Sequence, residues 1–322
     1  MTGRSLVLLA WIGAVIGLPI ALTAWALLRR SGRLRLAWAT TGLLLVAWSL
    51  GVWAFLIEPN LLVVRTVTIE SRTWTGPPVR LGLISDTHVA APHVDPARVA
   101  RVAARMNAQN PDLVLLLGDY AGGHEAAAIR AAPARSEVLR GVAAFKGLRP
   151  RLGVYAVLGN HDWWYDGGAT ERALARAGAR VLENQALRVD RPEGAFWVAG
   201  LADLDSKRAA PSYPQALSGV PTSEPVVVMT HWPDPFAQAP DRVALTVAGH
   251  THCGQVNLPV LGRLVHASHA SRQWGCGAYV DHGRNLFVTG GVGVSILPVR
   301  FRAPPEIVIV TLKGPALNSA DH

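Results

Sequence analysis

Apolar positions divide the chain into two parts with different patterns. Near the N-terminus, residues 5–28 and 36–57 form two apolar stretches without a charged side chain. A helix needs roughly 20 apolar residues to cross a bilayer, so each stretch is long enough, and Pro19 is tolerated in such a helix. The first stretch is too long for the core of a cleaved signal peptide and lacks its short positive start. We therefore predict a transmembrane helical hairpin over residues 1–58.

The charge between the two stretches predicts how the hairpin is oriented. The connecting segment contains four arginines, Arg29, Arg30, Arg33 and Arg35. Because positively charged loops stay cytoplasmic, both ends of the hairpin should lie on the outer side of the membrane. We expect a multi-pass protein of the cell (inner) membrane whose residues 59–322 face the outer, periplasmic side.

Beyond residue 58, short strand and helix patterns replace the long apolar stretches. An alternating segment predicts a strand within a linker over 59–77. Five apolar runs follow, each typical of a strand buried on both faces. These runs are 79–85, 112–118, 153–159, 225–230 and 243–249. Helical patterns occur at 95–110, 134–148 and 168–179, so the alternation predicts an α/β domain over 78–312, with a disordered tail over 313–322.

A polar cluster follows each of the five apolar runs. In α/β sheets, functional sites gather at the carboxyl ends of strands. The clusters supply Asp86, His88, Asp119, Asn160, His161, Asp162, His231, His250 and His252. Imidazoles, carboxylates and one amide oxygen suit Mn, Fe or Zn better than Mg, which prefers oxygen ligands alone. This set contains more candidate ligands than one ion needs, and it suits two ions.

Each cluster alone has an ordinary structural explanation. Asp86 and His88 could form an Asx turn, Asp119 could cap a helix, and His231 could be a hydrogen-bonded core histidine. The ordered set of five clusters is what favours a metal site over these explanations. The remaining histidines, which include His124 soon after Asp119, are not expected to be ligands.

The ordered segments SDTH, LGDY, LGNHD, THW and AGHTH resemble those of calcineurin-like metallophosphoesterases. The segments AGHTHCGQVNLPVLGRL and GVGVSILPVRFRAPPEIVIVTL are similar to the bacterial membrane-anchored branch of that family. The resemblance implies a four-layer α/β-β/α sandwich with the site at its edge. It implies that Asp86, His88, Asp119 and His252 bind the first of two divalent ions. Asp119 would bridge to the second ion, which Asn160, His231 and His250 complete.

The resemblance also implies two residues that act on the reaction without binding metal. His161 would stabilise the transferring phosphoryl group or protonate the leaving oxygen. Asp162 would hold that imidazole in the required tautomer. The implied function is a membrane-anchored two-metal phosphoesterase, which uses a metal-bridging hydroxide on phosphate or pyrophosphate esters. We expect its substrate to be lipid-linked or close to the membrane.

Three other functions are alternatives to this one. A UDP-2,3-diacylglucosamine pyrophosphatase of lipid A synthesis is similar to the anchored branch, but it meets its substrate on the cytoplasmic leaflet, which conflicts with the predicted orientation. A catalytically silent metal-binding sensor would have lost His161 or Asp162, and both are present. A structural membrane protein or transporter fits poorly with two spans that contain no charge.

Several further residues carry expectations that the sequence alone leaves open. Trp163 and Trp164 could wall the substrate cleft or pack on the sheet, and Arg272 is a candidate contact for a substrate anion. Cys253 stands where the resemblance predicts glycine, and we expect a small buried residue rather than a thiolate ligand. Cys253 and Cys276 could form one disulfide in an oxidising space, a point that the sequence does not decide.

Net charge narrows the class of partner. The chain carries a formal charge of +9, but after residue 58 no basic run is interleaved with aromatic residues. This pattern argues against nucleic acid and suits anionic substrates or lipid headgroups. The oligomeric state does not follow from the sequence.

Overall fold

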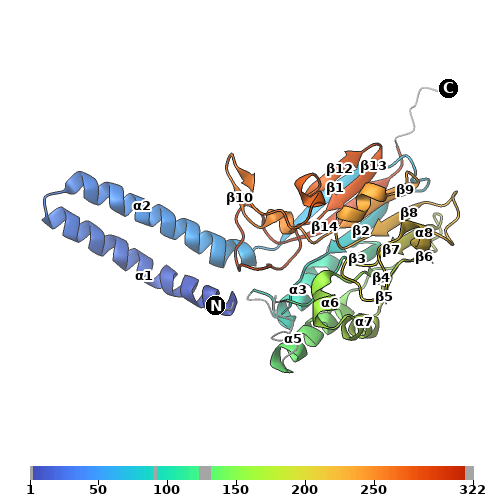
Figure 1. Ribbon diagram of the computed structural model, residues 1–322, viewed down its shortest axis with the longest axis horizontal. Coiled ribbons are helices and arrows are strands. Elements are labelled where there is room, and N and C mark those ends of the chain that lie inside the picture. Colours follow the sequence, from blue (N-terminus) through green and yellow to red (C-terminus); the bar gives the residue numbers. More distant parts are fainter. Residues whose placement is uncertain (1–2, 90–92, 123–131, 316–322) are drawn as a thin grey trace.

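A helical hairpin projects from a compact β-sandwich in the computed structural model, which describes residues 3–89, 93–122 and 132–315 (Figure 1). Helix α1 (Gly3–Arg30) and helix α2 (Leu34–Val52) run antiparallel. Helix α2 continues through a π-helical turn η1 (Trp53–Ile57) and a 3₁₀ turn η2 (Glu58–Asn60). Both helical segments are long and apolar enough to cross a membrane, which agrees with the predicted hairpin.

Two six-stranded sheets form the rest of the molecule. The first sheet contains, in spatial order, β1 (Val63–Glu70), β14 (Glu306–Lys313), β2 (Val79–Ile84), β3 (Leu113–Leu116), β4 (Val154–Ala156) and β5 (Ala179–Val181). The second contains β12 (Gly277–Asp281), β13 (Arg284–Val288), β9 (Val243–Ala248), β8 (Val226–Met229), β7 (Phe196–Gly200) and β6 (Gln185–Val189). Strands β2 to β5 are mutually parallel, as are β13, β9, β8 and β7.

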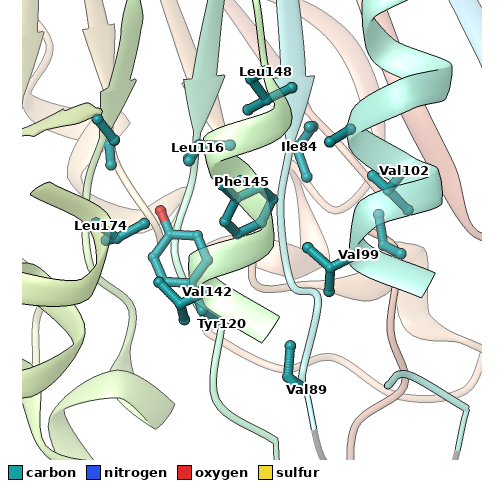
Figure 2. Packing of buried hydrophobic residues seen from close by; sticks show 14 of the residues in the cluster. Ile84, Val89, Val99, Val102, Leu116, Tyr120, Val142, Phe145, Leu148 and Leu174 are labelled. Atoms are coloured by element: carbon teal, nitrogen blue, oxygen red, sulfur yellow. The ribbon is translucent and has the colours of Figure 1, made fainter. Parts of the chain in front are cut away.

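Helices cover the outer face of each sheet, which gives four layers. Helices α3 (Pro96–Asn107), α5 (Ala132–Ala143) and α7 (Gly167–Arg176) lie on the first sheet. Figure 2 shows Val142 and Phe145 packed among Ile84, Leu116 and Tyr120 in this layer. A second apolar core fills the space between the sheets, and a third lies beneath the short helix α8 (Tyr213–Ala216) and the turn η4 (Asp234–Gln238). The expected four-layer sandwich is therefore confirmed.

The five apolar runs predicted as buried strands are β2, β3, β4, β8 and β9. The three predicted helices are also present, and Asp95 caps α3 by accepting a hydrogen bond from the Arg98 backbone at 2.7 Å. The strand expected in the linker is β1, which pairs with β14 along its whole length and so belongs to the first sheet. Strand β14 ends at Lys313, so the predicted tail overlaps its end; residues 316–322 lie outside the described residues.

The end of the helical hairpin is anchored to the sandwich by buried polar contacts. The Glu58 carboxylate is buried and accepts hydrogen bonds from Trp53 Nε1 at 2.6 Å and from the Ala303 backbone at 2.7 Å. The Arg300 backbone N–H donates to the Ala54 carbonyl at 2.9 Å. These contacts fix the position of the sandwich relative to the two apolar helices.

Candidate metal centre

The carboxyl ends of five parallel strands bring the predicted polar clusters to one edge of the sandwich. Strands β2 and β3 lead to the Asp86–His88 and Asp119 clusters, and β4 leads into the short helix α6 (Asn160–Tyr165). Strand β8 leads to His231, and β9 to His250 and His252. All of these candidate ligands are buried except His250, which is half-buried. Sheet topology alone therefore assembles the set that the sequence predicted.

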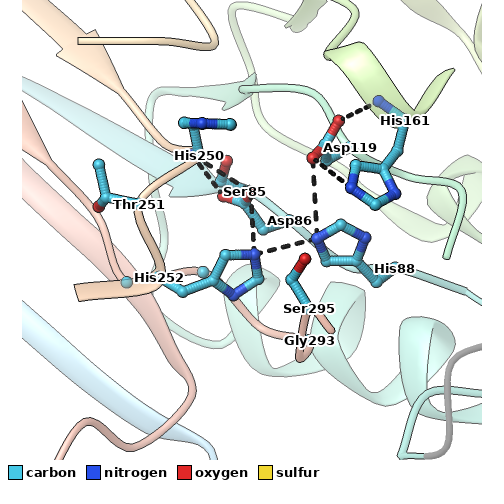
Figure 3. Close-up of polar contacts among 12 residues, drawn as sticks. Ser85, Asp86, His88, Asp119, His161, His250, Thr251, His252, Gly293 and Ser295 are labelled. Atoms are coloured by element: carbon cyan, nitrogen blue, oxygen red, sulfur yellow. Dashed lines mark hydrogen bonds and ion pairs between the residues drawn. The ribbon is translucent and has the colours of Figure 1, made fainter. Parts of the chain in front are cut away.

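One group of ligand atoms forms around Asp86, His88 and His252 (Figure 3). His88 Nε2 lies 3.0 Å from His252 Nε2, and His252 Nε2 lies 3.5 Å from Asp86 Oδ1. His88 Nε2 also lies 3.7 Å from Asp119 Oδ2. Ring nitrogens and carboxylate oxygens at these separations converge on a space that one cation could fill.

A second group forms around Asp119, His231 and His250. Asp119 Oδ2 lies 3.3 Å from His231 Nε2, which lies 3.3 Å from His250 Nδ1. The Asn160 side chain is buried, and its Oδ1 has no hydrogen-bond partner among the described residues. An orphaned amide oxygen is costly unless a cation or water satisfies it. Asp119 lies between the two groups, in the position of a bridging carboxylate.

Carbonyl groups orient two of the imidazoles toward the centre. His88 Nδ1 lies 3.2 Å from the Ala121 carbonyl, and His231 Nδ1 lies 2.7 Å from the Leu117 carbonyl. A ring that donates from Nδ1 presents its Nε2 lone pair, which is the arrangement of metal-binding histidines. The donor set therefore fits divalent cations.

Burial and neighbouring charges set the protonation of these groups. Burial, together with the charge of His161, lowers the pKa of His88 to about 3. Burial, with the charge of His231, lowers the pKa of His250 to about 3. Both rings are thus neutral, as a metal ligand must be. Burial works to lower the pKa of His231, but the nearby carboxylates, chiefly Asp119, raise it to about 10. His231 can therefore act as a ligand only where a bound cation takes the place of its second proton beside Asp119.

The backbone at the ligands adopts conformations that the sequence did not reveal. Asp86, His88, Asp119, His250 and His252 all have positive φ, between 45° and 67°. Each such non-glycine residue costs on the order of 1–3 kcal/mol, and such strain is concentrated at functional sites. The surrounding fold must hold these turns in place.

Two glycines allow the loops that bear the ligands to approach one another. A Cβ at position 159 would lie 2.3 Å from Asp119 Oδ1, and one at position 249 would lie 2.0 Å from Ser85 Oγ. Any larger residue at Gly159 or Gly249 would therefore displace a ligand loop.

Asp162 holds the Asp119 loop, which corrects the expected role of this residue. Its Oδ2 accepts hydrogen bonds from the backbones of Asp119 and Gly159, both at 2.9 Å. Its Oδ1 accepts from Tyr120 at 3.0 Å and Ala121 at 3.1 Å. The carboxylate is thus engaged by four backbone N–H groups, whereas we expected it to orient the His161 ring. It holds the backbone of the Asp119 loop instead.

The two neighbouring tryptophans differ in their surroundings. Trp163 is 7% exposed and packs in the core between the first sheet and its helices, which is the second of the two alternatives that the sequence left open. The Trp164 ring lies against the His161 ring, with 4.5 Å between the ring centroids, and Trp164 Nε1 donates to Asp205 Oδ2 at 2.8 Å. Arg272 is exposed on the turn η6 (Ala270–Arg272) and remains a candidate contact.

A second aromatic residue at the centre, Trp232, was not predicted from the sequence. Trp232 stacks on the His250 ring at 3.5 Å, and its Nε1 donates to the buried Asp203 at 2.9 Å. Burial raises the pKa of Asp203 to about 7. Trp232 directly follows the strand-end ligand His231, and this adjacency was the available signal. Trp164 and Trp232 thus each contact a histidine of the centre, and both bond to one loop.

A disulfide joins Cys253 and Cys276, with Cα atoms 4.8 Å apart. Cys253 is buried, as we expected of a small residue at this position, and the disulfide leaves it no free thiolate that could bind metal. The bridge connects the turn that carries His252 to the segment before β12.

A family model and several known proteins match this chain. A family model described as calcineurin-like phosphoesterase matches residues 79–254. The chain is 31% identical over 252 residues to a transmembrane protein with metallophosphoesterase domain of Danio rerio, which covers 73% of this chain and 53% of that protein. It is 29% identical over 277 residues to an uncharacterized metallophosphoesterase of Aquifex aeolicus, covering 84% of this chain and 98% of the relative.

Two further proteins are similar to this chain. The chain is 29% identical over 218 residues to the phosphodiesterase YaeI of Escherichia coli, covering 63% of this chain and 71% of that protein. A solved dimetal phosphatase from Danio rerio aligns with a TM-score of 0.42 at 15% identity, covering 66% and 88% of the two chains. The chain thus spans about half of the zebrafish relative and nearly all of the Aquifex one. With the family model matched over more than half of its length, the chain belongs to the calcineurin-like phosphoesterase family.

Proposed function

We propose that this protein is a membrane-anchored phosphoesterase that hydrolyses phosphate or pyrophosphate esters with two divalent ions. The observation that carries the proposal is the placement of Asp119, which groups with His231 and His250 and also with His88, a member of the Asp86–His88–His252 group. In this proposal the first ion is held by Asp86, His88, Asp119 and His252, and the second by Asp119, Asn160, His231 and His250. When bound, such ions activate water at neutral pH and stabilise the oxygens of an in-line displacement at phosphorus.

His161 serves as the group that acts on the phosphoryl oxygens. Its Nε2 lies 3.9 Å from Asp119 Oδ2, and its ring meets His88 edge-on at 4.6 Å. Its backbone N–H donates to Asp119 Oδ1 at 2.9 Å, which fixes α6 against the bridging residue. From this position the imidazole can donate a proton to a leaving oxygen or a hydrogen bond to the phosphoryl group. Asp162 supports this arrangement by holding the Asp119 loop.

The outer side of the membrane is the proposed location of the sandwich. The four arginines between α1 and α2 favour a cytoplasmic turn. The Cys253–Cys276 disulfide supports the same orientation independently, because such bonds persist in oxidising spaces outside the cytoplasm. This orientation disfavours a substrate presented on the cytoplasmic leaflet, such as UDP-2,3-diacylglucosamine. A lipid-linked or membrane-proximal phosphoester on the outer side is the proposed substrate class.

Turnover of a soluble probe tests the reaction class. The full chain, purified in detergent and loaded with Mn²⁺, should hydrolyse bis(p-nitrophenyl) phosphate, and removal of metal with EDTA should abolish the reaction. Metal content of the same sample should approach two ions per chain. Bound metal without turnover of this diester or of p-nitrophenyl phosphate would instead support a catalytically silent sensor.

A further inference from the structure

A set of exposed apolar side chains lies on two turns near the candidate centre. The first turn joins β10 (Asn257–Leu258) to β11 (Gly262–Arg263) and exposes Val260 by 105% and Leu261 by 71%. The second turn, at residues 296–298, exposes Ile296 by 71%. We name the whole set the apolar rim; it comprises Val260, Leu261, Leu264, Val265, Ile296 and Leu297. Large apolar side chains that are exposed together on two turns can mark an interaction surface.

The backbone presents two of these side chains at a conformational cost. Val260 has φ of 69° and Ile296 has φ of 60°. A β-branched residue rarely adopts the left-handed region, and tight turns normally place glycine, asparagine or aspartate there. The fold thus maintains strained turns whose outermost side chains are branched and apolar, and strain of this kind points to a function.

The apolar rim is joined to the end of the membrane-spanning hairpin. The Asn257 backbone donates to the Phe301 carbonyl at 2.9 Å, and the adjacent Arg300 backbone donates to Ala54 in η1, also at 2.9 Å. Figure 1 shows β10 on the edge of the sandwich from which α1 and α2 project. Trp53, at the end of α2, is 42% exposed, as is usual for tryptophans at a membrane interface. The rim therefore lies beside the point where the chain enters the bilayer.

The same two turns are continuous with the candidate metal centre. Gln255 follows the His252 turn, and its Nε2 donates to the carbonyls of Leu297 and Val299, both at 3.2 Å. The Gly293 backbone donates to the Asp86 carbonyl at 2.6 Å, and Figure 3 shows Gly293 and Ser295 beside His252. A surface that contacts these two turns would therefore lie next to the candidate metal ligands.

The charge around the rim identifies the class of surface. Residues 255–272 contain no aspartate or glutamate but include Arg263 and Arg272. Arg302, one residue after Phe301, is exposed. Apolar tips flanked by arginines match a lipid interface, where apolar side chains enter the acyl boundary and cations meet phosphate headgroups.

We propose that the apolar rim inserts into the lipid leaflet that α1 and α2 enter, and holds the candidate centre against the phosphate headgroups of that leaflet. The bilayer is the occupant because the hairpin already fixes this edge of the sandwich at its surface. The consequence for catalysis, preferential action on phosphoesters carried by membrane lipids, rests on the proposed function; the insertion itself does not.

Lipid quenching of a fluorescent label tests the insertion. The full chain is placed in phosphatidylglycerol–phosphatidylcholine nanodiscs after Val260→Cys has been labelled with an environment-sensitive dye under non-reducing conditions. We expect a blue-shifted emission and strong quenching when the lipids carry brominated acyl chains. Val280→Cys, on edge strand β12 and 74% exposed, is the matched control and should show neither effect.

A second variant tests whether the two turns act together. With the label at Leu297→Cys, the added pair Val260→Asp and Leu261→Asp should reduce quenching, while an unchanged thermal unfolding midpoint shows that the fold is intact. Equal, weak quenching at positions 260 and 280 would overturn the proposal. So would a blue shift that depends on protein concentration and not on lipid, which would indicate a second copy of the chain. Because quenching needs no turnover, insertion can fail or succeed independently of the proposed function.

Discussion

Asp119 is the residue on which both ligand groups depend. Its Oδ2 lies within 4.0 Å of three histidine ring nitrogens, from His88, His161 and His231. We expect Asp119→Ala to lose bound metal and phosphodiesterase activity together, because it removes the shared carboxylate. Metal analysis by mass spectrometry and turnover of the soluble diester, measured on one sample, check this. A variant that kept both ions would contradict a bridging role.

His161 differs from Asp119, because its proposed role is to supply a proton or a hydrogen bond and not to bind metal. His161→Ala should keep the metal content of the parent protein and lose rate on the order of 10²–10⁴-fold, the usual contribution of a general acid. The reduction should appear in kcat for substrates with poor leaving groups, and least for p-nitrophenolate. If the substitution emptied a metal site, His161 would be a ligand instead.

Asp162 allows a test of the role that the structure assigns against the one that the sequence suggested. Asp162→Asn replaces one carboxylate oxygen with an NH₂ group, which would face the backbone N–H groups that the oxygen had accepted. We expect a loss of about 1–3 kcal/mol in unfolding free energy, the cost of unsatisfied buried donors, with weaker metal binding. Thermal unfolding and metal titration of the full chain in detergent measure both.

Asp203→Asn is the matched control for that substitution. Asp203 is also buried, but among the described residues its hydrogen-bond donors are two, the Asp205 backbone and Trp232 Nε1. A smaller loss of stability is therefore expected. If Asp162→Asn were as stable as the parent and changed only the pH dependence of the rate, then Asp162 would act through the His161 ring after all.

The candidate ligands could be predicted because each follows an apolar run, and the end of a buried strand is visible in the sequence. Their geometry could not be predicted in the same way. The positive φ at Asp86 and His250, and the four donors around Asp162, arise from loops that meet only in the folded chain. Trp163 illustrates the same limit, because a tryptophan next to a site is equally able to pack inward.

At the scale of elements, patterns of apolar residues predicted the five strands that lead to the candidate ligands, but not the remaining strands of the two sheets or the role of the terminal strands. Strand β1 looked like part of a linker because its pattern alternates, with exposed residues on one face. Its pairing with β14, more than 200 residues away in the chain, could not be inferred from local pattern. Pairing between segments so far apart is decided by tertiary packing, which also explains why the tail was predicted to begin within β14.

The disulfide is the element-scale feature with the clearest consequence for stability. It closes a loop with a sequence separation of 23 between the His252 turn and the start of β12. Replacing Cys253 and Cys276 with serine should lower the unfolding free energy by about 3 kcal/mol, as loop closure of this length predicts. Denaturation of the full chain in detergent checks this, and a reductant should weaken the parent protein but leave the double variant unchanged. Equal stability of oxidised and reduced parent protein would contradict it.

At the scale of the whole molecule, the hairpin and the sandwich behave as one unit. Glu58 is buried at their junction and bonds to Trp53 on one side and to Ala303 on the other. In the proposed arrangement the two apolar helices do more than tether the sandwich, because they fix which of its edges meets the bilayer. That edge carries the apolar rim and lies next to the candidate centre, an arrangement that only the assembled structure reveals.

The orientation of this unit decides which leaflet the centre can reach, and it is directly measurable. With the arginine-rich turn inside, a periplasmic alkaline phosphatase reporter fused at the C-terminus should be active, and a green fluorescent protein fused there should be dark. Replacing Arg29, Arg30, Arg33 and Arg35 with glutamine should weaken that bias, because these residues hold the turn in the cytoplasm. In the parent protein, Cys253 and Cys276 should resist alkylation until a reductant is added, as expected of a domain in an oxidising space. A fluorescent C-terminal fusion with freely alkylated cysteines would place the sandwich in the cytoplasm, and would restore the cytoplasmic-leaflet substrate that the proposed orientation disfavours.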